Sequence, residues 1–148
     1  MKTKRLVAGT VFLAAALVAT GAGAAELKVL SDGAMKPALE ELVKGYQASS
    51  KGQVKIDYAS SADIEKKIDA GDDYDIIIVD KTIAAKLGKG GKIAIGSFKQ
   101  IAKKDDKLAF DAGMTNWTDQ AVPGNALIAF LATPKAAEVY KAKGLQPG

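Results

Sequence analysis

The sequence predicts an α/β fold: a three-layered lobe built on a small, mostly parallel sheet. Residues 53–58 alternate apolar and polar side chains, which is the period of a half-buried strand. Residues 76–79 form a continuous β-branched run, which is typical of a strand covered on both faces. Between the two strands, Ile64 and Ile68 share one face of a helical pattern that ends at Gly71. Together these segments form a β-α-β unit, whose crossover should be right-handed.

A second strand and helix precede this unit. Residues 26–30 predict a short strand, and residues 31–35 a tight turn. A helix should follow to about residue 46, because Pro37 suits a first helical turn. Its buried stripe is expected at Met35, Leu39, Leu42, Val43 and Tyr46. Two parallel strands of this kind place both helix starts at one sheet edge, where open α/β sheets bind ligands.

The remainder of the chain carries a weaker pattern until its end. We expect a short helix at 83–87, a fourth strand near 92–96, and a solvated charged run at 103–107. Residues 108–123 predict no regular element, and their one tryptophan, Trp117, is expected to be a packing anchor. Two closing helices are predicted, at 126–132 after a cap at Asn125 and at 136–143 after Thr133-Pro134. The expected sheet therefore contains strands near 26–31, 54–58 and 75–79, with 92–96 as a fourth member.

The first 25 residues predict a secretory signal peptide. Lys2, Lys4 and Arg5 give a basic start, residues 6–20 are rich in Leu, Ala and Val, and small residues follow at 22–25. A retained membrane anchor is the rival interpretation, but the apolar run is short for a span of about 20 residues. Export therefore predicts a periplasmic protein, with residues 26–148 as its single α/β lobe.

Composition excludes several classes of function. Removal of the three basic residues at the start leaves 18 basic against 17 acidic residues, and no basic stripe with interleaved aromatics points to nucleic acid. The absence of cysteine excludes a disulfide scaffold. The absence of histidine removes the commonest metal ligand and general base. We therefore expect no cofactor and no metal.

Ser60 and Ser61 lie where a strand passes into a helix, and such a junction suits an anion. The first helical turn has backbone N–H groups without intrahelical partners, and the helix dipole adds partial positive charge. The two hydroxyls would add uncharged donors. The alternative is that the pair only caps the helix, since Ser60 and Asp63 have capping-box spacing. Asp63 favours that alternative, because its carboxylate would repel an anion in the same turn.

Carboxylates raise a third hypothesis, an enzyme or a divalent-metal site. Asp72, Asp73 and Asp75 crowd one turn, and Asp80 ends the apolar strand. The ordinary interpretation is that acidic residues before a strand form a solvated turn and that Asp80 caps the next helix. Without His or Cys, a nucleophile and base could come only from Ser, Lys or carboxylates. We therefore predict that the chain is not an enzyme.

Three stretches, in this order and spacing, resemble the molybdate-type periplasmic solute-binding proteins of ABC transporters. They are LKVLSDGAMKPALEEL, YASSADIEKKIDAGDDYDIIIVD and ALIAFLATPKAAEVYKAKGLQPG, within residues 26–95 and 121–148. The resemblance implies the type II periplasmic-binding-protein fold, in which two α/β lobes hold a ligand between them. It implies no catalysis. It also implies that a small oxyanion such as molybdate or tungstate is handed to the membrane subunits of an ABC permease.

The resemblance also implies which residues contact the oxyanion. One contact position falls on Ser61, with Ser60 beside it, and the other falls in the turn that contains Ser31, Gly33 and Ala34. Molybdate binders usually carry a serine at the position of Ala34, which here offers only an N–H, so Ser31 is the nearest hydroxyl. Asp32 and Asp63 add negative charge to the two turns. These departures do not affect the assignment of the lobe. They count against molybdate as the ligand.

Length is the largest departure from the family. In the family, a second lobe is inserted between the strand that corresponds to residues near 95 and the helices that begin at about residue 125. In this sequence that interval is too short for a domain of ordinary size. Residues 96–120 are therefore expected to be a shortened remnant of the crossover and second lobe. One lobe leaves the ligand half solvated and lowers affinity, unless a homodimer rebuilds the cleft. The alternative function is a periplasmic protein-interaction or regulatory module, which an exposed apolar patch on that face would favour.

Overall fold

The computed structural model describes residues 26–50 and 52–148, and the predicted signal peptide lies outside the described residues. One six-stranded sheet forms the middle of the lobe, in the order β2-β1-β3-β5-β4-β6. Its strands are β1 (Leu27–Asp32), β2 (Val54–Ala59), β3 (Ile76–Asp80), β4 (Lys99–Lys103), β5 (Ala109–Met114) and β6 (Gln146–Pro147). β1 pairs in parallel with both β2 and β3, as predicted. The pairings β3–β5, β5–β4 and β4–β6 are antiparallel, so the sheet is mixed.

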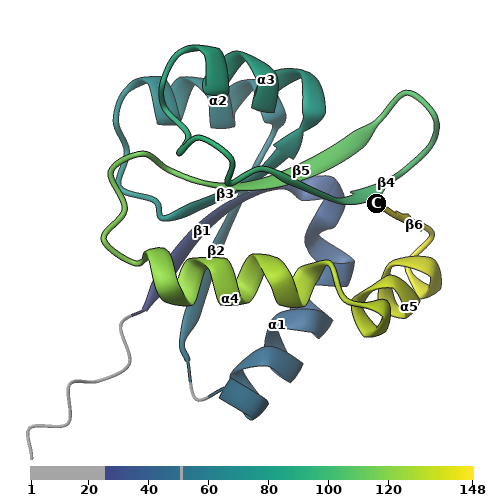
Figure 1. Cartoon of the computed structure of the whole chain (residues 1–148). Coiled ribbons are helices and arrows are strands. Elements are labelled where there is room, and N and C mark those ends of the chain that lie inside the picture. Colours follow the sequence, from purple (N-terminus) through teal and green to yellow (C-terminus); the bar gives the residue numbers. More distant parts are fainter. Residues whose placement is uncertain (1–25, 51) are drawn as a thin grey trace, which may run out of the picture.

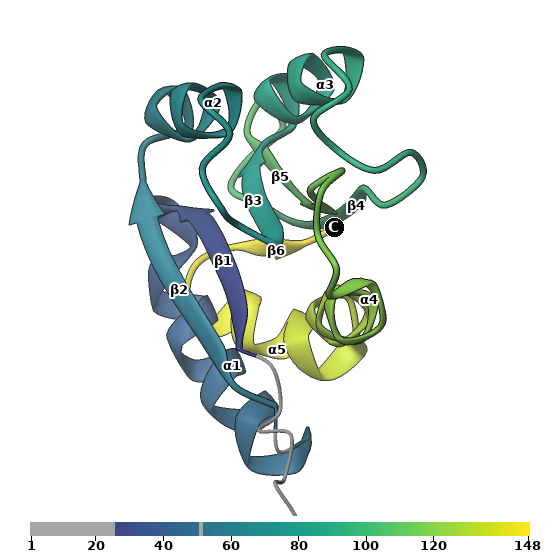
Figure 2. The same cartoon turned by 90° about the vertical axis from the view of Figure 1, so that its left-hand side faces the viewer.

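Helices cover both faces of the sheet, which gives the predicted three layers (Figures 1 and 2). They are α1 (Lys36–Ser50), α2 (Ser61–Asp69), α3 (Lys81–Lys89), α4 (Ala121–Leu131) and α5 (Pro134–Ala142), with a short 3-10 turn η1 (Gly33–Met35) before α1. α2 and α3 lie on one face, and α1, α4 and α5 lie on the other. Among residues 26–50 and 52–148, no helix combines the length and apolar character that a bilayer crossing requires.

β3 is the most deeply buried strand, because its side chains pack against the helices on both faces of the sheet. Ile76 and Ile78 belong to the core beneath α1, α4 and α5. Ile77 and Val79 belong to the core beneath α2 and α3. All four side chains have no exposed surface. The prediction of a strand covered on both faces is therefore confirmed, and its physical cause is the alternation of side chains across a pleated strand.

The second half of the sheet differs from the prediction. The expected fourth strand at 92–96 is wrong: Ile93 makes only an isolated bridge to Thr115, and Ile95 is fully exposed. The strand lies later, at β4. β5 occupies the stretch for which no element was predicted, although it is the antiparallel neighbour of β3. Trp117 is 38% exposed and does not anchor the core.

Several predicted helix bounds also change. α1 continues to Ser50, beyond the predicted end near residue 46, and α3 spans Lys81–Lys89, which is longer at both ends than the predicted 83–87. α4 begins at Ala121, so Asn125 lies inside the helix and does not cap it. The Thr133 cap of α5 is confirmed, since its hydroxyl accepts the N–H of Ala136 at 3.3 Å.

The turn between β4 and β5 lies at the edge where β1 and β3 end, because Asp80 pairs with Phe110 near the start of β5. Asp105 organises this turn by accepting the N–H groups of Lys107 and Leu108 at 2.8 and 2.9 Å. These two bonds hold the pKa of Asp105 below its usual range. Residues 96–120 thus form a hairpin within the lobe, and their origin as a remnant of a second lobe stays a prediction.

Truncation of β3 should weaken the fold strongly. Ile77→Ala leaves a cavity in the core beneath α2 and α3, so we expect the free energy of unfolding to fall by roughly 2–5 kcal/mol. Ile95→Ala is the matched control, because this fully exposed side chain should change stability by less than about 0.5 kcal/mol. Urea unfolding measures both. Equal losses in the two variants would contradict the packing described for β3.

Asp111 on β5 is an ionisable group in an unfavourable position. Its Oδ1 is buried without a hydrogen-bond partner. Burial raises the pKa of the Asp111 carboxyl; nearby Lys81 opposes this effect and Asp80 adds to it. A carboxyl whose pKa is higher in the folded than in the unfolded chain costs stability when it ionises. Stability should therefore fall as pH rises through the folded pKa.

Asp111→Asn should accordingly stabilise the protein near neutral pH, because it removes the buried charge. The gain over the natural protein should shrink as pH falls through the folded pKa of Asp111, where the carboxyl becomes neutral. Urea unfolding between about pH 4 and pH 8 measures this difference. Asp106→Asn is a control for net charge on the neighbouring turn. A gain that stays constant with pH would contradict the assigned cause.

Candidate functional site

The predicted ligand-binding residues come together at one edge of the sheet. β1 and β2 end side by side there, with Asp32 in register with Ala59. Figure 2 shows both strands running to the end at which α2 begins. Gly33 and Ala34 follow β1, while Ser60 and Ser61 follow β2. This edge is formed by the carboxyl ends of parallel strands, where open α/β sheets bind their ligands.

Ser60 caps α2. Its hydroxyl accepts the N–H of Asp63 at 3.2 Å and donates to the Asp63 carboxylate at 2.8 Å. The capping interpretation is therefore confirmed for this serine. Its side chain is also exposed at the edge, so the hydroxyl remains within reach of a solute.

Ser61 has a different role, because it connects three elements. Its hydroxyl donates to Oδ2 of Asp32 at 2.5 Å and accepts the N–H of Asp80 at 3.4 Å. The ends of β1 and β3 are thereby joined to the start of α2. The sequence did not predict that the backbone N–H of Asp80 bonds to Ser61. The backbone of Asp80 comes near Ser61 only because β1 pairs with β3.

The Asp32 carboxylate accepts hydrogen bonds from two of the predicted donors, Ala34 and Ser61. One carboxylate oxygen accepts the N–H of Ala34 at 2.9 Å, and the other accepts the Ser61 hydroxyl. Two donors from separate turns thus surround a single anionic group. The position of Asp32 before a glycine was a signal for a local turn of this kind, because Asp side chains often accept backbone N–H groups two residues on.

Gly33 and Ser31 complete the predicted set. Gly33 is exposed, and a side chain added at its Cα would meet no atom within 4 Å. Ser31 is fully buried and donates its hydroxyl to the backbone oxygen of Asp32 at 3.2 Å. The structure therefore places Gly33 at the open surface and Ser31 beneath it.

Charges of both signs surround this edge. Asp32, Asp63 and Asp80 contribute carboxylates, while Lys36 and Lys81 contribute ammonium groups at the starts of α1 and α3. A hollow of about 470 Å³ adjoins the start of α3. It is lined by Lys81, Thr82, Ala85, Gln100, Lys103, Asp105, Asp106, Lys107 and Ala109. The edge can thus offer hydroxyl, backbone N–H and ammonium donors to a small polar solute.

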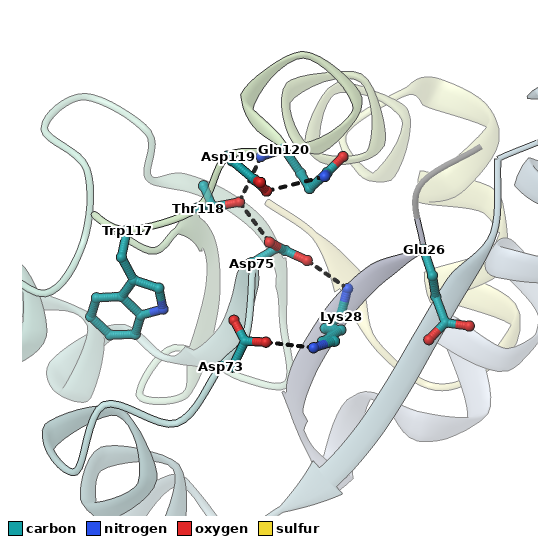
Figure 3. A pocket seen from close by; sticks show the side chains of 8 residues that line it. All are labelled: Glu26, Lys28, Asp73, Asp75, Trp117, Thr118, Asp119 and Gln120. Atoms are coloured by element: carbon teal, nitrogen blue, oxygen red, sulfur yellow. Dashed lines mark hydrogen bonds and ion pairs between the residues drawn. The ribbon is translucent and has the colours of Figure 1, made fainter. Parts of the chain in front are cut away.

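A second pocket, of about 310 Å³, lies at the opposite edge, where β1 and β3 begin (Figure 3). Its polar groups bind one another. The Lys28 ammonium pairs with Asp73, while Asp75 accepts the Lys28 N–H at 2.9 Å and the Thr118 hydroxyl at 2.6 Å. These bonds join the start of β1 to the loop before α4. The pocket is therefore better explained as a structural junction than as a solute site.

The acidic residues of the enzyme hypothesis are divided between the two ends of β3. Asp75 precedes β3 and Asp80 ends it, so the length of the strand, roughly 17 Å, separates them. Asp72 pairs with Lys67 at 3.7 Å, and Asp80 caps α3 by accepting the N–H of Thr82 at 2.8 Å. In the part of the chain that the structure describes, no group of three or more His, Cys, Asp or Glu residues could hold a metal ion.

Large exposed apolar side chains lie away from the site. Within the described ranges they are Ile95, Trp117 and Val122. All three belong to segments near the start of β3, since Ile93 bridges Thr115 directly after the β3–β5 ladder. The edge that carries Ser60 and Ser61 is polar.

Solved structures share this architecture. The substrate-binding domain assigned to a molybdenum ABC transporter from Clostridium difficile aligns with a TM-score of 0.75 at 9% identity, over 83% of this chain and 99% of that one. The periplasmic molybdate-binding protein of Azotobacter vinelandii gives 0.75 at 14% identity, over 82% and 99%. The sulfate-binding protein SubI of Mycobacterium tuberculosis gives 0.69 at 10% identity, over 82% and 86%. At these identities the likeness establishes the type II binding-protein fold alone.

The family follows from the sequence itself. No curated protein sequence matches the chain. The model of a protein family described as bacterial extracellular solute-binding protein matches residues 27–119, which is more than half of the chain. This match includes both turns that carry the predicted donors. The chain belongs to the family of bacterial extracellular solute-binding proteins.

Proposed function

We propose that this protein captures a small tetrahedral oxyanion, of the class that includes molybdate, tungstate, sulfate and phosphate, for an ABC transporter. One observation carries the proposal: the Ala34 N–H and the Ser61 hydroxyl converge on the two oxygens of a single carboxylate. The Asp32 carboxylate stands in for the oxygens of an anion at this point. Neutral donors from two helix starts are what an oxyanion site requires.

The ligand would lie on the open side of the two turns. Gly33 permits close approach of the ligand to the backbone, and Ser60 adds an exposed hydroxyl beside Ser61. Ser31 would support the turn from beneath. Lys36 and Lys81 begin α1 and α3 at the same edge, and the Lys36 ammonium pairs with Glu40 at 3.8 Å. No reaction is proposed, because the site needs only to hold and release its solute.

The proposal includes export and transport partners. Residues 1–25 would direct the protein to the periplasm and be removed there, and the membrane subunits of an ABC permease would receive the ligand. One lobe covers only one side of the oxyanion. A homodimer that joins two such edges would enclose it and exclude water, which strengthens hydrogen bonds to charged groups.

A protein-interaction module is the alternative function, and the structure favours it less. Such a role would be supported by an apolar patch at the edge where the second lobe is expected to be missing. The exposed apolar residues of the described chain lie toward the opposite edge instead. The polar edge is better suited to a solute.

Thermal unfolding with and without millimolar molybdate, tungstate, sulfate or phosphate, at fixed ionic strength, tests the proposal. A ligand at about 100 times its dissociation constant adds roughly 2.7 kcal/mol, which shifts the midpoint by several degrees. Ser61→Ala removes the donor that links both turns, so the shift should fall sharply. Ser49→Ala at the end of α1 is the matched control and should leave the shift unchanged. A shift that survives in the Ser60→Ala, Ser61→Ala double variant would place the site elsewhere.

A further inference from the structure

β2 is an open edge of the sheet. It is the first strand in the spatial order, and within the described chain it pairs only with β1 (Figure 2). The edge strand at the other end of the sheet is β6, which has two residues, and one of them is Pro147. Short strands and proline protect an edge from pairing with another chain. β2 has six residues and no proline, so it is the edge that remains able to pair.

The ladder with β1 determines which backbone groups of β2 face outward. Gln53 accepts a β1 N–H at 2.9 Å, and every second residue after it faces β1 in the same way. The N–H and C=O groups of Val54, Ile56 and Tyr58 therefore point away from the sheet. Among the described residues, the Gln47 side chain accepts the N–H of Val54 at 2.9 Å and is the one side chain bonded to this side of the strand. The outward groups of Ile56 and Tyr58 can thus serve a partner strand.

The side chains of β2 carry a self-complementary charge pattern. Lys55 and Asp57 are both exposed and flank Ile56. Within residues 26–50 and 52–148, neither belongs to an ion pair. The Tyr74 hydroxyl donates to one oxygen of Asp57 at 2.9 Å, and the other oxygen remains available. If two β2 strands pair antiparallel about Ile56, Lys55 of each copy lies opposite Asp57 of the other. Opposite charges in directly opposed positions stabilise a strand pair.

Only this register satisfies both the backbone and the charges. Centred on Ile56, the outward groups of Ile56 bond to their own counterparts, and those of Val54 meet those of Tyr58. A pairing centred on Lys55 also joins outward groups, but it places Lys55 opposite its own copy. A pairing centred on Asp57 places two carboxylates together in the same way. Like charges directly opposite one another are destabilising, so the charges select the register about Ile56.

Apolar surface at this edge is also incompletely buried in a single lobe. Val54, Ile56 and Tyr58 are half-buried and pack against the core beneath α1. A hollow of about 380 Å³ adjoins the strand. It is lined by Glu40, Val43, Lys44, Ile56 and Tyr58. Pairing about Ile56 would place the two Ile56 side chains together and Tyr58 against Val54, all on the face that carries α1, and would remove this apolar surface from water.

We propose that β2 is a dimer interface, at which two copies of this chain pair their β2 strands antiparallel about Ile56 and join the two sheets into one. A twofold axis would relate the lobes. The inference goes beyond the proposed function. Because the two β2 strands run in opposite directions, the edges that carry Ser60 and Ser61 lie at opposite ends of the dimer. This contact therefore differs from a dimer that would join those two edges.

Sedimentation equilibrium of the purified protein, at concentrations from about 1 μM to 1 mM, tests the inference. The natural protein should show a monomer–dimer equilibrium within this range. Lys55→Asp should weaken the dimer at least about tenfold, because it turns both opposite-charge pairs into like-charge pairs. Asp57→Lys should weaken it by a similar factor for the same reason.

Two combinations of these substitutions test the register itself. The double variant Lys55→Asp, Asp57→Lys restores opposite charges and should dimerise as the natural protein does. An equimolar mixture of the two single variants should form a heterodimer, because each supplies the charges that the other lacks. Lys99→Asp is the matched control, since it reverses an exposed lysine on β4, on the far side of the same sheet. It should leave the dimer unchanged.

The outcomes are decisive in both directions. A natural protein that remains monomeric at about 1 mM overturns the inference. So does a dimer that both single variants leave intact, or that neither the double variant nor the mixture restores, because its interface then lies elsewhere. These results are independent of anion binding beside Ser60 and Ser61, which the thermal unfolding experiment measures.

Discussion

Burial of β3 on both faces is the constraint on which the rest of the lobe depends. Four consecutive side chains, from Ile76 to Val79, have no contact with solvent, so helices must cover both faces of the sheet. The backbone polar groups of a buried strand must also be paired. β1 provides a parallel ladder on one side and β5 an antiparallel ladder on the other. The ends of these strands in turn fix where the turns with Asp32 and Ser61 meet.

The elements that could be predicted are those whose signal is local. The continuous apolar run of β3, the alternation in β2 and the capping residues at Ser60 and Asp63 each lie within a few residues. β5 could not be predicted in this way, because its sequence contains Asp111 and Gly113, which are poor strand formers. It is a strand because β3 requires a second neighbour. The expected strand at 92–96 failed for the converse reason: the apolar Ile95 has no layer to pack against.

In the candidate site, too, the sequence predicted the local features and not the contacts that depend on the fold. Local patterns predicted the two helix starts and the serine pair Ser60 and Ser61, because strand ends and caps are local features, whereas Ala34 was predicted only from the family resemblance. It could not show that Ser61 donates to Asp32, since that bond forms only after β1 and β2 have paired. Asp32 was recognised as a charge that an oxyanion would meet. Its position as the shared acceptor of both turns is a property of the folded lobe.

The hairpin between β4 and β5 has a consequence for how such lobes are assembled over evolutionary time. The chain leaves the sheet at Lys103 and returns at Ala109, and these points are neighbours because the strands pair. Polypeptide inserted between them would cost loop-closure entropy that grows only with the logarithm of its length, roughly 0.6 kcal/mol per doubling. A large segment could therefore be inserted into or deleted from this turn at small entropic cost, without changing the pairing of the six strands or the edge that carries the candidate site.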